Sequence, residues 1–554
     1  MIFDPAQIQR GARLKRSPYF DATQRAGCRG YTVYNHMLPA SAHLRPTTIA
    51  IFFVLLMAVA SAPIATHPLP PLSDYVNHLA RTHVIDAIAT DPNLARYYTV
   101  EWQIIPNLMI DLIVPVLHRF MSVYLAGQIF TILAFLLIAS GTLVLSRALN
   151  GRWSPVPLVA LPLLYNGVLL VGVMNYVFGI GLVLWALALW VMLREHAWPW
   201  RFAVSTLFTI ALFFCHLFAA GVYGLGLLAL ELNRLWLRRH EPWVPRFAEF
   251  AAAGISFVPI AVLLVVSPTW NAPGSPAFWE LSGKLHGLAA VFDVYYLAVA
   301  AGLLAAATMG AVYAWRCGIL TFNPAGWAIL VVGCVAYLAL PRAMFGAHLA
   351  DQRLPIAIAF MLVACFEVDL RDRAIRHGFM VLVASLLVVR VAEVQLVWNQ
   401  LDRGTKEFFR SVEKIKRGAR VLVVYGDRST GKEISDFNLV HAASMAVIER
   451  SALVSTEFTV KGKQILHARK EFQKYVETED WLPPSLPYVL RIAEGNKADV
   501  SYFWKDWPQH YDYVYILFTT PGMHNPDRNH LGLVHEGGAF QLYRVLPTIS
   551  AVGR

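Results

Sequence analysis

Long apolar stretches recur along this chain and constrain its fold more than any other feature. Of its 554 residues, 57% are hydrophobic and 15% are charged, whereas soluble proteins carry about 25% charged residues. Apolar runs of roughly 17–25 residues are typical of helices that cross a bilayer. Eleven such runs predict spans near 47–64, 122–146, 155–172, 175–193, 202–216, 218–233, 248–267, 288–314, 324–340, 355–370 and 378–397. The chain is therefore predicted to be a polytopic α-helical membrane protein.

Basic residues predict how the chain is oriented. The tail at 1–46 is rich in arginine, and every second loop after it is basic as well. Because cytoplasmic loops are enriched in Lys and Arg, we expect a cytoplasmic N-terminus and a C-terminal part on the opposite side. This bias accounts for the formal net charge of +11, so the charge does not indicate a nucleic-acid partner.

The compartment follows from two absences in the sequence. The chain has no Asn-x-Ser/Thr glycosylation signal, and none of its five cysteines lies in a predicted outer segment. Both observations favour a bacterial inner membrane with the C-terminal part in the periplasm.

The composition divides the chain into three parts. A basic cytoplasmic tail (1–46) is expected to be disordered, and a transmembrane domain (47–397) contains one large outer loop at 65–121. The remainder (398–554) has a soluble composition and is predicted to be a periplasmic α/β domain.

Apolar runs predict strands and helices within residues 398–554. Residues 420–425 and 513–518 are predicted to be buried strands, and 540–545 a half-exposed strand. Helical patterns fall near 440–453 and 468–477.

The large outer loop has two amphipathic patterns. Ser73 can cap a helix that begins at Asp74. Its apolar positions recur at helical spacing: Val76, Leu79, Ala80, Val84, Ala87 and Ile88. Asp74, Asn77, His78 and Arg81 form the opposite, polar stripe. A second helix is predicted from about Asn107 to Phe120 and carries Asp111. We expect both helices to lie on the outer leaflet.

Two of the outer residues are suited to chemistry. Asp74, in the first turn of its helix, could act as a general base, or it could only stabilise the helix terminus. Arg353 directly precedes a span, where its guanidinium could bind a lipid phosphate or anchor the headgroup region. His348 and Asp351, in the same late loop, could orient Arg353 or touch a sugar.

Together these features resemble the GT-C superfamily of membrane glycosyltransferases, which use polyprenyl-phosphate-linked sugars. The likeness covers most of 47–554 and rests on the architecture, on Ser73-Asp74-Tyr75 and on Arg353. Segments 175–179 and 441–444 are similar to those of uncharacterised bacterial members.

The resemblance implies that Asp74 is the catalytic carboxylate and that Arg353, with Arg342, binds the donor phosphate. No second acidic residue adjoins Asp74, and no metal or other cofactor is predicted. The acceptor is unknown. Further candidates for substrate binding are Tyr75, Asn77, His78, Arg81, Asp111, His216, His348 and Asp351.

Three other functions remain open. A lipid-linked glycan polymerase or ligase also consumes polyprenyl-linked sugars, but usually has its large outer loop late in the chain. A transporter or flippase would be expected to have charged or broken helices at mid-membrane depth. A non-catalytic scaffold that presents the C-terminal domain is the third.

Overall fold

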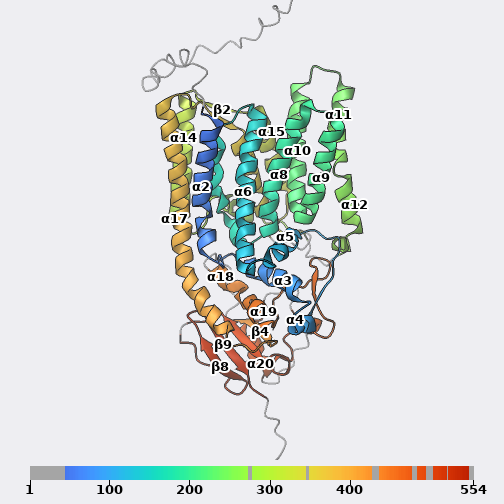
Figure 1. Ribbon diagram of the computed structural model, residues 1–554, viewed down its shortest axis with the longest axis vertical. Helices are drawn as coiled ribbons and strands as arrows, with labels where there is room; N and C mark the ends of the chain where they lie inside the picture. Colours follow the sequence, from blue (N-terminus) through green and yellow to red (C-terminus); the bar gives the residue numbers. More distant parts are fainter. Residues whose placement is uncertain are drawn as a thin grey trace, which may run out of the picture.

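The computed structural model places a bundle of membrane helices at one end of the molecule and the C-terminal domain at the other (Figure 1). The structure describes residues 44–271, 277–344, 349–426, 436–476, 483–493, 503–520 and 522–547. The predicted disordered tail therefore lies almost wholly outside the described residues.

The bundle confirms the prediction of a polytopic membrane protein. Within the described ranges, seven helical segments are long and apolar enough to cross a bilayer. They are α2 (Pro46–Thr66), α6 (Val123–Asn150), α8 (Met174–Met192, extended by a 3-10 turn to Glu195), α9 (Trp198–Cys215), α11 with α12 (Trp243–Ile255 and Val258–Val266), α14 (Leu297–Arg316) and α17 (Arg373–Val412). Between them lie α10 (Leu217–Leu237), α15 (Pro324–Ala339) and α16 (Ala350–Ala364).

The predicted span at 155–172 is not a single α-helix. It consists of a 3-10 segment, η4 (Val156–Leu164), and the short helix α7 (Gly167–Val171). Pro157 and Pro162 lack the N–H groups that an α-helix would need there. Most of this segment is buried in the bundle, where irregular backbone is tolerated at membrane depth because protein surrounds it.

Helix α17 joins the two ends of the molecule (Figure 1). Its 40 residues span about 60 Å, twice the thickness of the hydrocarbon core of a bilayer. Phe408 and Val412, near its end, are buried in the core of the C-terminal domain. The helix thus passes without interruption through residue 397, the predicted domain boundary.

The C-terminal domain is built on a mixed sheet whose described strands follow the order β5-β4-β7-β9-β8. The strands are β4 (Arg420–Tyr425), β5 (Leu453–Val454), β7 (Tyr513–Leu517), β8 (Leu531–Glu536) and β9 (Phe540–Val545). Strands β5, β4 and β7 are parallel, while β9 and β8 are antiparallel to their neighbours. The α/β prediction is confirmed.

Two details of that prediction are wrong. Strand β9 is buried from Phe540 to Tyr543 and not half-exposed, because separate apolar clusters cover the two faces of the sheet. The helix expected at 468–477 is replaced by β6 (Leu466–Ala468) and a 3-10 turn, η9 (Gln473–Tyr475). Strand β6 forms because it pairs with a strand of the outer loop, β1 (Tyr98–Val100).

Helix α3 (Tyr75–Ala87) connects the bundle to the C-terminal domain (Figure 1). Tyr75 and Leu79 belong to the apolar core of the bundle. Val76, Ala80 and Val84, on the other face, belong to the core of the C-terminal domain. One helix is therefore shared by two hydrophobic cores.

The expectation that the polar stripe of this helix lies on the leaflet surface is wrong. Asn77, His78 and Arg81 are buried, because the C-terminal domain covers the face that the sequence pattern assigned to water. Arg81 forms a bidentate ion pair with Asp111 of α5 (Met109–His118). The Nε–Oδ1 distance is 2.7 Å and the Nη2–Oδ2 distance is 3.0 Å. Both side chains are fully buried.

Removing one partner of this ion pair should be strongly destabilising. Asp111→Asn leaves the buried Arg81 guanidinium without a counter-charge, for which we expect a loss of about 3–5 kcal/mol. Chemical denaturation of the detergent-solubilised protein measures it.

The double variant Arg81→Met with Asp111→Leu is the matched control, because it removes both charges together and should recover most of the loss. Arg119→Gln, which removes a mostly exposed partner of Asp86, should have little effect. Equal losses for all three variants would contradict the assignment.

Candidate active site

Asp74 precedes the first residue of α3 and is held by backbone contacts to the turn after α7. The N–H groups of Ser73 and Asp74 donate to the carbonyls of Leu170 (2.9 Å) and Val171 (3.1 Å). Gly172 has φ +86°, and a Cβ there would lie 2.7 Å from the Asp74 nitrogen. The carboxylate remains partly open, with 29% of the side chain exposed.

The C-terminal domain places a histidine beside this carboxylate. His441, between α18 (Phe437–Val440) and the 3-10 turn η8 (Ala442–Ser444), has its Nε2 atom 3.6 Å from Asp74 Oδ1. The sequence analysis noted segment 441–444 only as a resemblance. It gave no signal that His441 meets Asp74, because the two residues are far apart in the chain.

Asn77 determines which nitrogen of His441 carries the proton. The Asn77 side-chain oxygen accepts from the Phe458 N–H (3.1 Å), and its Nδ2 donates to the Thr456 carbonyl (2.9 Å). The amide orientation is thereby set, and Nδ2 lies 3.4 Å from His441 Nδ1. His441 Nδ1 must then be the acceptor, which places the ring proton on Nε2 and directs it at the Asp74 carboxylate.

Burial keeps this histidine neutral. Burial lowers the pKa of His441 to about 4. The pKa of His78, one turn along α3 from Asp74, is also well below its ordinary value, because of burial and then the charge of Arg81. At neutral pH the Asp74 carboxylate thus faces an N–H dipole and not a second full charge.

Buried polar groups without partners gather where α3 meets the C-terminal domain. Among the described residues, His78 Nδ1, Ser444 Oγ, Thr456 Oγ1 and both Glu457 carboxylate oxygens have no hydrogen-bond partner. Burial raises the pKa of Glu457 to about 8, and the positive charge of Arg81 opposes this increase. Glu457 is therefore protonated at neutral pH and can donate a hydrogen bond.

Arg353 on α16 lies against His216, which caps α10. The Arg353 Nη1 atom is 3.1 Å from His216 Nε2, and the Phe218 N–H donates to His216 Nδ1 at 3.1 Å. These two contacts cannot both be hydrogen bonds. If Nδ1 accepts from Phe218, Nε2 of a neutral ring carries a proton and points it at the guanidinium; a charged ring has no acceptor at all.

An anion bound beside the two groups would remove this conflict. A phosphate oxygen could accept from Arg353 and from His216 Nε2–H together, and charge-assisted bonds of this kind are the stronger class. The N-terminus of the 21-residue helix α10 adds a favourable dipole at the same place.

The turn between α7 and α8 touches both groups. Val171 and Gly172 contact the Asp74 backbone. Tyr176, in the first turn of α8, donates its hydroxyl to the Arg353 carbonyl (2.6 Å) and packs edge-on against the His216 ring. One short segment, 171–176, therefore contacts the Asp74 backbone, the Arg353 backbone and the His216 ring.

Other predicted site residues have different surroundings. Arg81 and Asp111 bind each other, as described above, and the Tyr75 ring packs against Gly127 of α6. Arg342 pairs with Glu280 at 2.8 Å. Asp351 is fully buried 3.2 Å from the Lys284 ammonium, a residue that the sequence analysis did not select. His348 lies outside the described residues.

No geometry typical of a metal site occurs in the part of the chain that the structure describes, where no three His, Cys, Asp or Glu side chains come together. The metal-free prediction remains a prediction.

Comparisons with known proteins add only a distant likeness. No family model matches the chain, and no curated protein matches it. The structure is similar to the crystal structure of ArnT from Cupriavidus metallidurans bound to undecaprenyl phosphate. The identity is 12% and the TM-score 0.48, with 92% of this chain and 99% of that chain covered. No residue role transfers at this level of similarity.

Acidification should weaken the contact between α3 and the C-terminal domain. The unfolded chain protonates His441 near pH 6.5, but the folded protein resists protonation until about pH 4, so stability falls as the pH drops through this window. The expected loss from His441 is about 3 kcal/mol at the lower end. Denaturation midpoints between pH 7 and pH 4 measure it.

His441→Gln should reduce that pH dependence, because the titrating group is gone. His377→Gln, which removes an exposed histidine at the opposite end of the bundle, should leave the wild-type slope unchanged. An unchanged slope in His441→Gln would contradict the assignment.

Glu457 should have the opposite pH dependence. Because its pKa in the folded protein is raised to about 8, its contribution to stability is lost as the pH rises from about 4.5 to 8. Glu457→Gln should therefore stabilise the protein at pH 7, by roughly 2–3 kcal/mol, and flatten its stability over this window. A destabilised Glu457→Gln protein at pH 7 would show that the ionised carboxylate is needed.

Proposed function

We propose that this chain is a membrane glycosyltransferase that moves a sugar from a polyprenyl-phosphate donor to an acceptor, on the side of the membrane where the C-terminal domain lies. The observation that carries the proposal is the meeting of two donor atoms, Arg353 Nη1 and His216 Nε2, which lie 3.1 Å apart. Tyr176 contacts both residues and lies four residues after Gly172, which packs against the backbone of the partly exposed Asp74. Such a pairing suits a substrate with a phosphate next to the reacting carbon.

Asp74 is proposed as the general base. It takes the proton of an acceptor hydroxyl while the acceptor oxygen bonds to the anomeric carbon. The bond from that carbon to the phosphate oxygen breaks at the same time, and polyprenyl phosphate leaves with the electron pair. His441 Nε2–H, 3.6 Å away, faces the carboxylate and orients it.

Arg353 and His216 are proposed to bind the departing phosphate. They supply positive charge and an N–H donor where negative charge develops in the transition state, the usual source of electrostatic stabilisation in transfer reactions. No metal is required in this scheme.

An apolar cavity near Arg353 supports a lipid-linked donor. It lies between α10, α15 and α16 and is lined by Val222, Leu225, Gly226, Ile329, Val332, Gly333, Leu354, Ile358 and Met361. Leu354 is the residue next to Arg353, and the other lining residues of α16 continue into the membrane. Gly226 and Gly333 lack side chains that would meet Leu187 and Ile358. The cavity has a volume of about 10 Å³, too small for a lipid chain, so a polyprenyl chain from a phosphate bound at Arg353 would extend along the apolar surface of α16 past Leu354 and Ile358.

Turnover and donor binding by two variants test the roles separately. The full-length protein is assayed in nanodiscs with a panel of polyprenyl-phosphate sugars. Asp74→Asn should lower turnover by about 10²–10⁴-fold and retain donor binding. Arg353→Gln should weaken donor binding, since it removes a charge-assisted contact to the phosphate.

Asp86→Asn and Arg119→Gln are the matched controls, since they remove a carboxylate of α3 and an arginine of the same outer loop away from the site. Normal turnover in Asp74→Asn would overturn its role as the base. Donor binding by wild type with no transfer to any acceptor, and lipid movement across the bilayer instead, would favour the flippase.

A further inference from the structure

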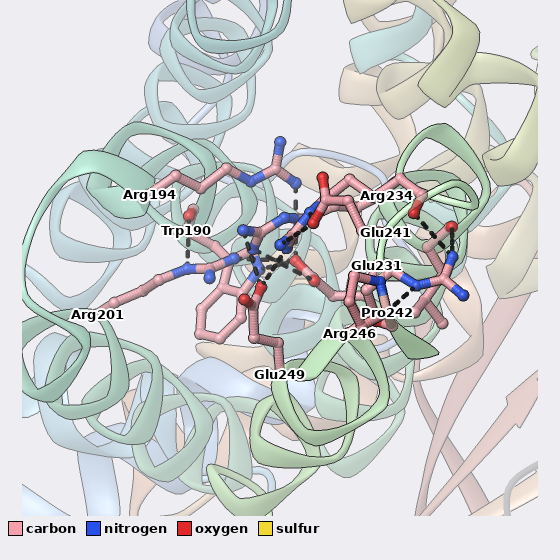
Figure 2. A network of polar contacts seen from close by, with 11 residues as sticks. Trp190, Arg194, Arg201, Glu231, Arg234, Glu241, Pro242, Arg246 and Glu249 are labelled. Carbon is pink, nitrogen blue, oxygen red and sulfur yellow. Dashed lines mark hydrogen bonds and ion pairs between the residues drawn. The ribbon is translucent and has the colours of Figure 1, made fainter. Parts of the chain in front are cut away.

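A dense network of arginines and glutamates lies at the end of the bundle away from the C-terminal domain. It joins the ends of α8 and α10 to the starts of α9 and α11 (Figure 1, Figure 2). This is the predicted cytoplasmic side, and none of these residues takes part in the proposed transfer reaction.

One buried carboxylate organises the network. Glu231 of α10 accepts from Trp190 Nε1 (2.7 Å) and from Arg201 Nη2 (2.9 Å). The Arg201 guanidinium also stacks 3.6 Å from the centre of the Trp190 ring. Arg194 and Arg234 stand further from the same carboxylate, at 3.7 and 3.9 Å. Figure 2 shows their guanidinium groups gathered around Glu231.

The network has more positive than negative charge. It contains five arginines and three glutamates. The arginines are Arg194, Arg201, Arg234, Arg238 and Arg246, and the glutamates are Glu231, Glu241 and Glu249. This leaves an excess of two positive charges.

The guanidinium groups of Arg194 and Arg246 have N–H donors that could bind a further anion. Within the described residues, Arg194 Nε is buried without a hydrogen-bond partner. The contacts of Arg246 are to backbone carbonyls, those of Leu235 (3.1 Å), Arg238 (2.9 Å) and Pro242 (3.3 Å). The Arg194 side chain is 28% exposed, so an anion at the surface of the network can reach the exposed part of its guanidinium.

Four tryptophans show the depth of the network in the membrane. Trp198, Trp200, Trp236 and Trp243 flank it, each between 65% and 70% exposed. Exposed indole rings favour the headgroup level of a bilayer. The arginines are thus at the depth where lipid phosphates lie.

We propose that this network is a binding site for the phosphate of an anionic phospholipid in the adjacent leaflet. Its net positive charge favours an acidic headgroup over a zwitterionic one, as basic pockets at the cytoplasmic ends of membrane helices do. The cavity inside the network is only about 10 Å³, so the headgroup lies over the outer rim, against Arg194 and Arg246. The site is independent of the proposed transfer reaction.

Lipid titration of the full-length protein tests this site. Nanodiscs of phosphatidylcholine, with and without phosphatidylglycerol, are compared by thermal unfolding, and bound phosphatidylglycerol is counted by native mass spectrometry. Wild type should gain stability with phosphatidylglycerol, since a ligand of the folded state stabilises it. The double variant Arg194→Gln with Arg246→Gln should bind about 10- to 30-fold more weakly.

Arg316→Gln is the matched control, because it removes an exposed arginine from the same predicted side at the end of α14. Single Arg246→Gln, whose contacts are only to backbone, keeps the test valid if the double variant does not fold. Equal responses of wild type, Arg316→Gln and the network variants would overturn the proposal. So would a stabilisation of wild type by inorganic phosphate in phosphatidylcholine alone that matches the one by phosphatidylglycerol.

Discussion

The packing of α3 between two hydrophobic cores is the constraint on which the site depends. Tyr75 and Leu79 pack in the core of the bundle. Val76, Ala80 and Val84 pack in the core of the C-terminal domain. The helix can satisfy both cores in only one rotation about its axis. That rotation turns Asn77 towards Thr456 and Phe458 and brings Asp74 to His441. The C-terminal domain is therefore part of the site, and its burial of α3 sets the protonation of the groups around Asp74.

A second interaction gives the site its proposed specificity. The hydrogen bond from the Phe218 N–H to Nδ1 fixes the tautomer of a neutral His216, with its proton on Nε2. Arg353 lies against this protonated Nε2. An anion accepts hydrogen bonds from both Arg353 and His216 more strongly than a neutral group does. The same logic applies at the opposite end, where arginines exceed carboxylates, although the anion there would be a lipid headgroup and not a reactant.

Sequence patterns predicted the bundle well because the length of an apolar run is a local signal. The span at 155–172 was predicted with the wrong helix type, since its prolines act against a continuous α-helix while its apolar composition still suits the interior. The polar stripe of α3 was predicted to face water, because periodicity distinguishes polar from apolar faces but not a solvent from a second domain. Asp74 and Arg353 were selected from the sequence. His441 and Lys284 were not, because their partners are distant in the chain and only the folded structure pairs them.

The most direct test of the central claim is the structure of the full chain with a bound polyprenyl phosphate, determined by electron cryomicroscopy in nanodiscs. The account predicts that the phosphate lies within hydrogen-bond distance of Arg353 Nη1 and His216 Nε2. It also predicts that the lipid chain follows the apolar surface of α16 past Leu354 and Ile358. A phosphate bound elsewhere in the molecule, with Arg353 and His216 still facing each other without an anion, would contradict it.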